Sequence, residues 1–165
     1  GGVDNCLVKM VDPVLMGIAI DKKVTAAGKS VVKANPHEKV GAFCKKNGKP
    51  STIEYIDMSE EMREKRLNDG ELEYGEGNFI SHLLSLEAIE IIANNDLKYH
   101  VAIKNGLYKF ETFIFDGFEF LDDMLVMRVD RDEEFAPIKN KEGKDSPESA
   151  KEIYERNLER CKNLK

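Results

Sequence analysis

A carboxylate and an amide stand together near the start of the sequence, at Asp4-Asn5. A carboxylate at the end of a strand is a natural ligand for a hard cation such as Mg²⁺, because open α/β sheets bind ligands at that edge. An Asx turn uses the same dipeptide, and the dipeptide alone favours that simpler interpretation. Asp4 is therefore a candidate metal ligand that needs support from other residues.

Three further segments carry groups suited to a polar, phosphorylated ligand. Glu54 ends a predicted strand, where its carboxylate can accept hydrogen bonds from sugar hydroxyls. Gly77 permits close approach of the backbone, and Asn78 offers both a donor and an acceptor. Lys139 follows Pro137 in a restricted loop, where an ammonium can neutralise phosphate charge in a transition state. Taken alone, each residue is more simply explained by an ordinary turn or a solvent-facing position.

The remaining chemical groups give weaker signals. His37, His82 and His100 lie far apart without HxH or HxxxH spacing, which favours structural roles. The acidic run over residues 130–134 is typical of a solvated surface rather than a metal site. Core packing explains most phenylalanines between residues 110 and 120, with one or two lining a pocket.

Composition limits the classes of protein. The chain has 165 residues, enough for one domain or a large piece of one, with 41% hydrophobic residues and a net charge of −6. Its lysines and arginines are spread along the chain, which argues against binding to nucleic acid. No apolar run is long enough to cross a bilayer. Three separated cysteines favour a reducing compartment, so the prediction is a cytoplasmic protein without a membrane partner.

Hydrophobic spacing and turn residues predict a mixture of strands and helices, hence an α/β or α+β class. Asn47-Gly48 predicts a hairpin, because both residues tolerate positive φ. The predicted strands are 29–33, 40–45, 51–55, 71–74, 99–103 and 124–129. The predicted helices are 59–67, 81–93, a helical spacing over 110–121 and a last helix from Ser146-Pro147, with 14–20 a helix or strand and 75–78 a tight loop.

The order of several short segments resembles the eukaryotic-type UDP-N-acetylhexosamine pyrophosphorylases and the related UDP-glucose and UDP-sugar enzymes. These segments occur in the family's order and cover nearly the whole chain. They are Val3–Lys9, Asp12-Pro13, Val31–Gly41, Glu54-Tyr55, Gly77-Asn78 with His82, Tyr99–Ala102, Lys109–Asp116, Glu134–Asn140 and Lys144–Pro147.

The resemblance implies an α/β fold with a mixed-sheet, Rossmann-like, GT-A-like nucleotidyltransferase domain. It implies a reaction of UTP with a hexose 1-phosphate, favouring N-acetylglucosamine 1-phosphate, to give UDP-sugar and pyrophosphate with Mg²⁺. By matching position, Asp4 and Lys139 would be catalytic, with Asp4 also the metal ligand. The residues implied to bind substrate are Asn5, Lys33, Gly41, Glu54, Gly77, Asn78, Phe113 and Phe115.

The chain also departs from the family pattern. Ile56-Asp57 follows Glu54-Tyr55 where a second Glu is common, and Lys104-Asn105 replaces a pair of lysines, which bears on the sugar bound. The family's glycine-rich loop for the UTP phosphates has no match. Residues 1–165 are therefore predicted to be the C-terminal part of the catalytic domain, inactive alone and partnered by the rest of that domain or a second copy. One alternative is a non-catalytic module that binds a sugar phosphate or nucleotide sugar, and another is a structural or interaction domain with a decayed site.

Overall fold

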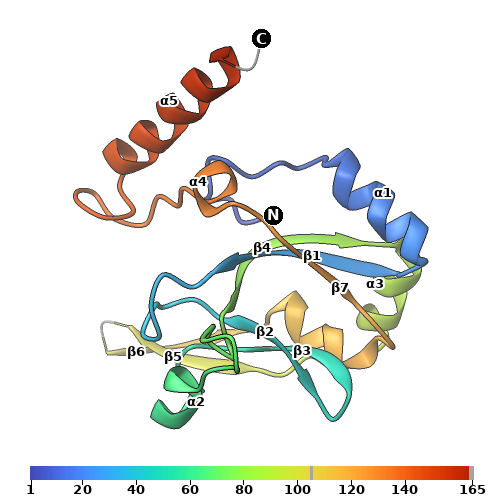
Figure 1. The fold of residues 1–165 in the computed structure, drawn as a ribbon. Helices are drawn as coiled ribbons and strands as arrows, with labels where there is room; N and C mark the ends of the chain where they lie inside the picture. The colour runs from blue at the N-terminus through green and yellow to red at the C-terminus, as the bar shows by residue number, and fades with distance from the viewer. Residues whose placement is uncertain (105, 164–165) are drawn as a thin grey trace.

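A five-stranded mixed sheet forms the centre of the chain in this computed structural model (Figure 1), which describes residues 1–104 and 106–163. The strand order is β3-β2-β4-β1-β7, with β7 parallel to β1 and the other neighbours antiparallel. β5 and β6 form a separate two-stranded sheet. The strands are β1 (Ala26–Val32), β2 (Ala42–Lys46), β3 (Lys49–Ile53), β4 (Glu76–Leu84), β5 (His100–Lys104), β6 (Leu107–Glu111) and β7 (Leu125–Arg128).

Helices cover both faces of this sheet. The helices are α1 (Pro13–Lys22), α2 (Glu60–Glu64), α3 (Leu86–Ala93), the 3₁₀ helix η1 (Ile114–Phe120), α4 (Arg131–Glu134) and α5 (Pro147–Asn163). Successive residues of a strand point to opposite faces, so Ala26 packs with α3 and η1 while Ala27 packs with α1. The fold is thus a mixed α/β layer structure, which confirms the predicted class.

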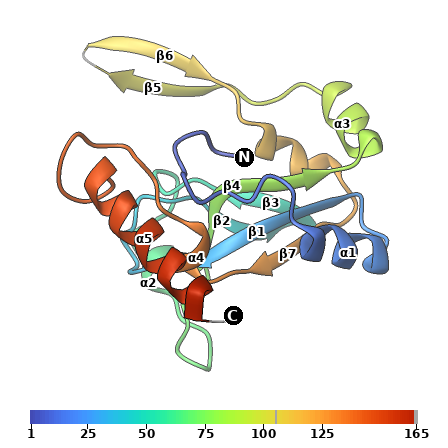
Figure 2. The ribbon, with the colours of Figure 1, turned by 90° about the horizontal axis from the view of Figure 1, so that it is seen from above.

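Two small structures lie outside this sheet and its covering helices. The β5–β6 hairpin projects away from the five-stranded sheet, as Figure 2 shows from above. The C-terminal helix α5 lies apart from the sheet and contacts α4 (Figure 1). Among the described residues, no helix is both long and apolar enough to cross a membrane.

Local sequence signals explain several element boundaries. Asp12 caps α1 by accepting hydrogen bonds from the first amides of the helix, and Pro13 follows as its first residue. Asn47 and Gly48 have φ values of 53° and 81°, so the predicted β2–β3 hairpin is confirmed. The predicted strands near 99–103 and 124–129 and the final helix are also present.

The predicted helix over 81–93 is wrong in its first part. Leu83 and Leu84 pair with β1 as the end of β4, and the Ser85 side chain caps a helix that begins only at Leu86. An apolar run of this length fits a buried strand as well as a helix, and pairing with β1 decides the outcome. The predicted loop at 75–78 is also wrong, because β4 begins at Glu76.

Other corrections concern short segments with mixed signals. Residues 71–74 form no strand and make one isolated bridge, between Arg66 and Leu72. The helical spacing over 110–121 begins in β6, and only residues 114–120 are helical, as a 3₁₀ helix. Helix α2 ends at Glu64 rather than near residue 67. Asn105, noted in the sequence as a family departure, lies outside the described residues.

Candidate functional site

Two cavities are lined by residues predicted for the site. We call the first the Glu54 cavity: it measures about 420 Å³ and lies between β3, residues 96–100 and η1. We call the second the Lys139 cavity: it measures about 460 Å³ and lies between residues 35–40 and the loop over 135–145. Val40 lines the Lys139 cavity, while the neighbouring Gly41 lies against Glu54.

Gly41, Glu54 and Asn78, which were predicted from three separate segments, come together in the structure. A Cβ atom on Gly41 would lie 2.7 Å from Oε1 of Glu54, so only glycine leaves this carboxylate its place. The backbone amide of Asn78 donates a 2.8 Å hydrogen bond to the backbone carbonyl of Gly41. These contacts connect the edge of the Glu54 cavity to the central strand β4.

A bulge in β4 sets the orientation of Asn78. Gly28 pairs with His82 and Ser30 pairs with Asn78, so β4 carries extra residues opposite β1. Within the bulge Ile80 has φ of 60°, which is unfavourable for a β-branched residue. Oδ1 of Asn78 accepts hydrogen bonds from the Ile80 amide (3.0 Å) and from Nε2 of His82 (2.9 Å). The Nδ2 group is thereby directed toward the hydroxyl of Thr52, at 3.5 Å.

His82 is suited to hold the Asn78 side chain because its ring stays neutral. Burial lowers its pKa to about 4. Its ring also packs edge-on against Phe43 and Phe118, with centroid distances of 6.1 and 5.0 Å. A neutral ring whose Nε2 carries the proton donates to the Asn78 oxygen. Sequence spacing assigned His82 a structural role and gave no sign of this contact.

His100 and Asp116 also line the Glu54 cavity, and sequence reasoning named neither as a site residue. Nε2 of His100 lies 2.7 Å from Oδ2 of Asp116, and both side chains are largely buried. Phe113 packs on His100 with a centroid distance of 4.8 Å and stacks on Phe115 at the same distance. The two phenylalanines therefore support the histidine that lines the cavity. The family segments contained His100 and Asp116, but spacing could not show that they meet.

The charges around Glu54 alter its acidity. Burial raises the pKa of the Glu54 carboxyl, Asp57 and Asp116 raise it further, and His100 acts in the opposite direction. A carboxylate with few compensating partners and a raised pKa is a strong acceptor for hydroxyl groups that enter the cavity.

The Lys139 cavity has a different construction. Nζ of Lys139 lies 3.8 Å from Oδ2 of Asp4, and both side chains remain about half exposed. Asp4 does not end a strand: the surrounding residues form turns, with one isolated bridge between Asn5 and Pro137. The amide of Lys139 donates to the carbonyl of Asp145 at 2.7 Å. Asp4 and Lys139 are thus brought together from distant parts of the sequence.

Asn5 holds these two segments to each other. Its side chain is buried, donates to the carbonyl of Glu134 at 2.7 Å and accepts from the amide of Ala136 at 2.8 Å. The Ile138 amide also donates to the carbonyl of Asp4 at 2.8 Å. The structure thereby gives Asn5 a supporting position beneath Asp4 and Lys139. Its predicted contact with substrate stays a prediction.

A buried cluster of ion pairs forms around Glu134, the residue whose carbonyl binds the Asn5 side chain. The Lys29 ammonium pairs with the carboxylates of Asp12 and Glu134, and Lys9 pairs with Glu134 from the surface at 3.1 Å. The Lys29 ammonium also holds the pKa of Asp12 below its usual value. Residues 130–134 were interpreted as a solvated acidic run, and Glu134 corrects that, because it is buried against Lys29.

Lys33 and Gly77 lie close together at the end of β1, with Gly77 in β4 and Lys33 directly after β1. A Cβ atom on Gly77 would lie 3.0 Å from the Val31 carbonyl and 3.7 Å from Cγ of Lys33, so glycine is needed for close strand packing. Lys33 is buried and its Nζ points to the sulfur of Met58 at 3.8 Å, while burial lowers its pKa. The predicted contacts of both residues with substrate stay predictions.

The chain matches a family of known proteins over most of its length. The family model described as UTP–glucose-1-phosphate uridylyltransferase matches residues 1–156. The chain belongs to this family. It is 36% identical over 91% of its length to UDP-N-acetylhexosamine pyrophosphorylase-like protein 1 of Homo sapiens and 39% identical over 91% to UDP-N-acetylglucosamine diphosphorylase 2 of Arabidopsis thaliana. These matches cover 34% and 33% of the two relatives, so the chain spans about a third of their length.

Solved structures of similar proteins have the same fold as this chain. UDP-N-acetylglucosamine pyrophosphorylase from Trypanosoma brucei, solved in complex with an inhibitor, matches with a TM-score of 0.79 and 31% identity, over 91% of this chain and 33% of that one. A putative UDP-N-acetylglucosamine pyrophosphorylase from Entamoeba histolytica matches with a TM-score of 0.84 and 29% identity, over 93% and 43%. The resemblance found in the sequence is confirmed, and so is the mixed-sheet fold expected from it.

Proposed function

We propose that the full-length protein is a uridylyltransferase that joins UTP and N-acetylglucosamine 1-phosphate, and that this chain supplies the sugar side and part of the phosphate side of its site. The meeting of Gly41, Glu54 and Asn78 beside the Asp4–Lys139 pair carries the proposal. The names of the relatives, which include UDP-N-acetylglucosamine pyrophosphorylases, give the substrate class.

The Glu54 cavity suits the sugar. Its walls combine acceptors such as Glu54 and Asp116 with the apolar side chains of Leu97 and Phe120. Sugars present both hydroxyl groups and apolar ring faces, so such a mixed wall complements them. The Glu54 carboxylate would accept hydrogen bonds from sugar hydroxyls, and the oriented side-chain amide of Asn78 would donate one to the sugar.

The Lys139 cavity suits the phosphate groups. Lys39, Lys139 and Lys144 all line it, together with Asn35 and Asn140. In the proposed reaction an oxygen of the sugar phosphate attacks the α-phosphorus of UTP, and the bond to pyrophosphate breaks. Charge grows on the phosphate oxygens as this bond breaks, so the Lys139 ammonium stabilises that state more than the ground state.

Asp4 fits the proposed Mg²⁺. Magnesium in nucleotide sites is commonly held by one or two carboxylates together with substrate phosphates. The Asp4 carboxylate is partly exposed and lies beside Lys139, so it can reach an ion shared with phosphate. When bound, the ion would withdraw charge from the phosphate oxygens. Asp4 would hold the ion, and Lys139 would neutralise the phosphate oxygens that the ion does not contact.

The test is pyrophosphate release by the full-length protein with UTP, Mg²⁺ and a series of sugar 1-phosphates. We expect the highest kcat/KM with N-acetylglucosamine 1-phosphate and a large loss in Asn78→Ala. The 165-residue chain alone should release no pyrophosphate, because its sequence has no glycine-rich loop for the UTP phosphates. Release by the chain alone would contradict its predicted dependence on the rest of the domain. Sugar-phosphate binding without turnover by the full-length protein would favour a binding module instead.

A further inference from the structure

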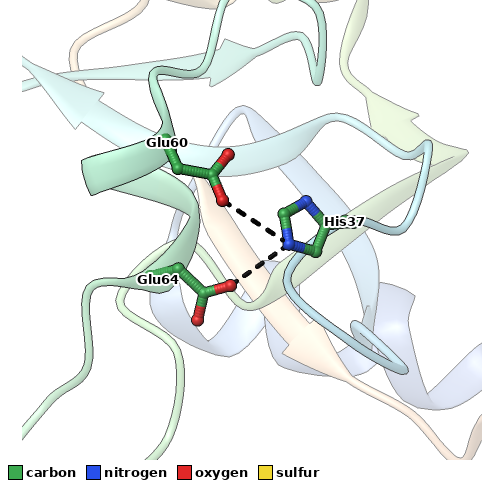
Figure 3. Close-up of side chains that lie close together, drawn as sticks. All are labelled: His37, Glu60 and Glu64. Atoms are coloured by element: carbon green, nitrogen blue, oxygen red, sulfur yellow. Dashed lines mark ion pairs between the residues drawn. The ribbon is translucent and has the colours of Figure 1, made fainter.

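Three side chains converge on one point of the surface. Figure 3 shows His37 facing Glu60 and Glu64. Nε2 of His37 lies 3.6 Å from Oε1 of Glu60 and 3.2 Å from Oε1 of Glu64. All three ligand atoms lie within 4.8 Å of one another. Of the three, only His37 also lines the Lys139 cavity, and none has a role in the proposed reaction.

The backbone positions the three groups before any ion arrives. Glu60 and Glu64 are four residues apart on α2, so their side chains share one face of the helix. Ser59 caps this helix, and Arg63 anchors it by donating to the carbonyls of Tyr55 and Met58 at 2.7 and 3.2 Å.

The loop that carries His37 is anchored in the same way. The His37 amide donates to Oδ1 of Asn35 at 3.0 Å. The next residue, Glu38, accepts hydrogen bonds at 2.7 Å from the Ala34 amide and from Arg131. The imidazole and the carboxylates therefore come from two separately fixed segments.

The two distances from His37 fit a tetrahedral zinc site. Zinc bonds to nitrogen and carboxylate oxygen are about 2.1 Å long, which places neighbouring ligands of a tetrahedron about 3.4 Å apart. The two observed distances from His37 lie on either side of that value. We propose that His37, Glu60 and Glu64 bind one zinc ion, with water in the fourth position.

Charge and ligand chemistry support the same ion. Among the ion pairs of the described residues, Glu60 and Glu64 pair only with His37. Neither carboxylate has a lysine or arginine partner among those residues, and a divalent cation supplies positive charge. An imidazole ligand favours zinc over Mg²⁺ or Ca²⁺, which prefer oxygen ligands throughout.

The experiment measures zinc binding to the tag-free, metal-stripped full-length protein by competition with a fluorescent chelator, and stoichiometry by native mass spectrometry. We expect His37→Ala and Glu64→Gln to weaken zinc affinity by more than about 10-fold. Glu61→Gln is the matched control, because Glu61 is exposed on the same helix but outside the cluster, and it should bind zinc as the wild type does. Excess Mg²⁺ should not displace the zinc.

Three results would overturn the proposal. One is the absence of bound zinc at a concentration well above that of the protein. Another is equal affinity in wild type, His37→Ala and Glu64→Gln. The last is loss of binding when the free cysteines Cys6, Cys44 and Cys161 are replaced by serine, which would assign the ion to thiols. The activity of the enzyme enters none of these readouts, so failure here leaves the proposed function untouched.

Discussion

The Glu54 cavity and the Lys139 cavity are adjacent but rest on different kinds of support. Gly41 and Glu54 flank the paired strands β2 and β3, and Asn78 belongs to the central strand β4. Asp4 and Lys139 lie on irregular segments that share one isolated bridge, beside Asn5. The first cavity is positioned by a ladder of backbone hydrogen bonds, and the second by a few buried side chains.

This difference indicates how each cavity should respond to mutation. A backbone ladder distributes its support over many residues, so one side-chain change near Glu54 alters contacts locally. Beneath Lys139 the support depends on the Asn5 amide and the Lys29 ammonium. A change in either removes much of what holds the segment from Glu134 to Lys139. Substitutions in these two regions therefore test the comparison directly.

Lys29→Met should have the largest effect. The fully buried Lys29 neutralises the buried Glu134 and the nearby Asp12, so its replacement leaves the carboxylates without their main partner. Breaking a buried ion pair in this way costs about 3–5 kcal/mol of unfolding free energy. Urea unfolding of the full-length protein measures this loss.

Lys9→Met provides the control for Lys29. Lys9 also pairs with Glu134, but 49% of its side chain is exposed, so its loss should cost less than about 1 kcal/mol. Equal stability losses in Lys29→Met and Lys9→Met would mean that Lys29 is not the main support.

The stability that Asp12 contributes should also depend on pH. Lys29 lowers the pKa of Asp12, so this contribution is present above the ordinary value of 3.8 and is lost as the pH falls below that.

Lys139→Ala should lower kcat of the full-length enzyme about 10²-fold, equivalent to about 2.7 kcal/mol of barrier. In the proposed reaction the lysine acts on charge that develops as the bond to pyrophosphate breaks, so the loss should be in kcat. Because the ammonium is half exposed, thermal stability should change little. Steady-state kinetics at saturating substrates and a thermal melt measure the two effects.

Lys141→Ala is the matched control in the same loop. The Lys141 side chain is 93% exposed and pairs with its neighbour Glu142, so the variant should keep a normal kcat. A near-normal kcat in Lys139→Ala would assign Lys139 to the solvated surface instead.

Glu54→Gln should weaken sugar binding but stabilise the fold. Loss of one charged acceptor for a sugar hydroxyl should raise KM for the sugar phosphate about tenfold, or about 1.4 kcal/mol. Burial raises the pKa of Glu54, so the folded state is destabilised by the ionised carboxylate at neutral pH. The neutral glutamine removes that penalty.

The pH dependence of this difference gives a second check. The wild type should approach the stability of Glu54→Gln as the pH falls through the raised pKa of the folded state toward the ordinary 4.5. Thermal melts of both proteins between pH 7 and pH 4 measure the gap. A gap that widens on acidification would contradict the raised pKa of Glu54.

The same contrast explains what the sequence could predict. The Asn47-Gly48 hairpin and the cap of α1 follow from local rules, and the resemblance placed Gly41, Glu54 and Asn78 near one site. The bulge in β4 depends on pairing with β1, which hydrophobic spacing cannot detect. The apolar residues around Leu83 and Leu84 were therefore assigned to a helix.

Long-range side-chain contacts were beyond sequence reasoning for a related reason. Asn5 is bound to residues about 130 positions away, and Lys29 reaches Glu134 across 105 positions. Burial of Glu134 in an otherwise acidic run is decided by that distant lysine. The pairing of His100 with Asp116 likewise needs β5 and η1 to meet.

Ile80→Asn should have the smallest effect. Ile80 lies where the N-terminal segment contacts the bulge in β4. The Gly2 amide donates to the Ile80 carbonyl, linking the segment of Asp4 to the bulge that orients Asn78. Ile80 has φ of 60°, which is costly for a β-branched residue and better tolerated by asparagine. The variant should gain about 0.5–1 kcal/mol in unfolding free energy with the bulge retained. Ile89→Asn is the control, since Ile89 is equally exposed (44% against 42%) in the regular helix α3 and should show no gain. Thermal unfolding of both variants decides the matter: equal changes in stability would mean that Ile80 stores no strain, and the bulge would then be held by its hydrogen bonds alone.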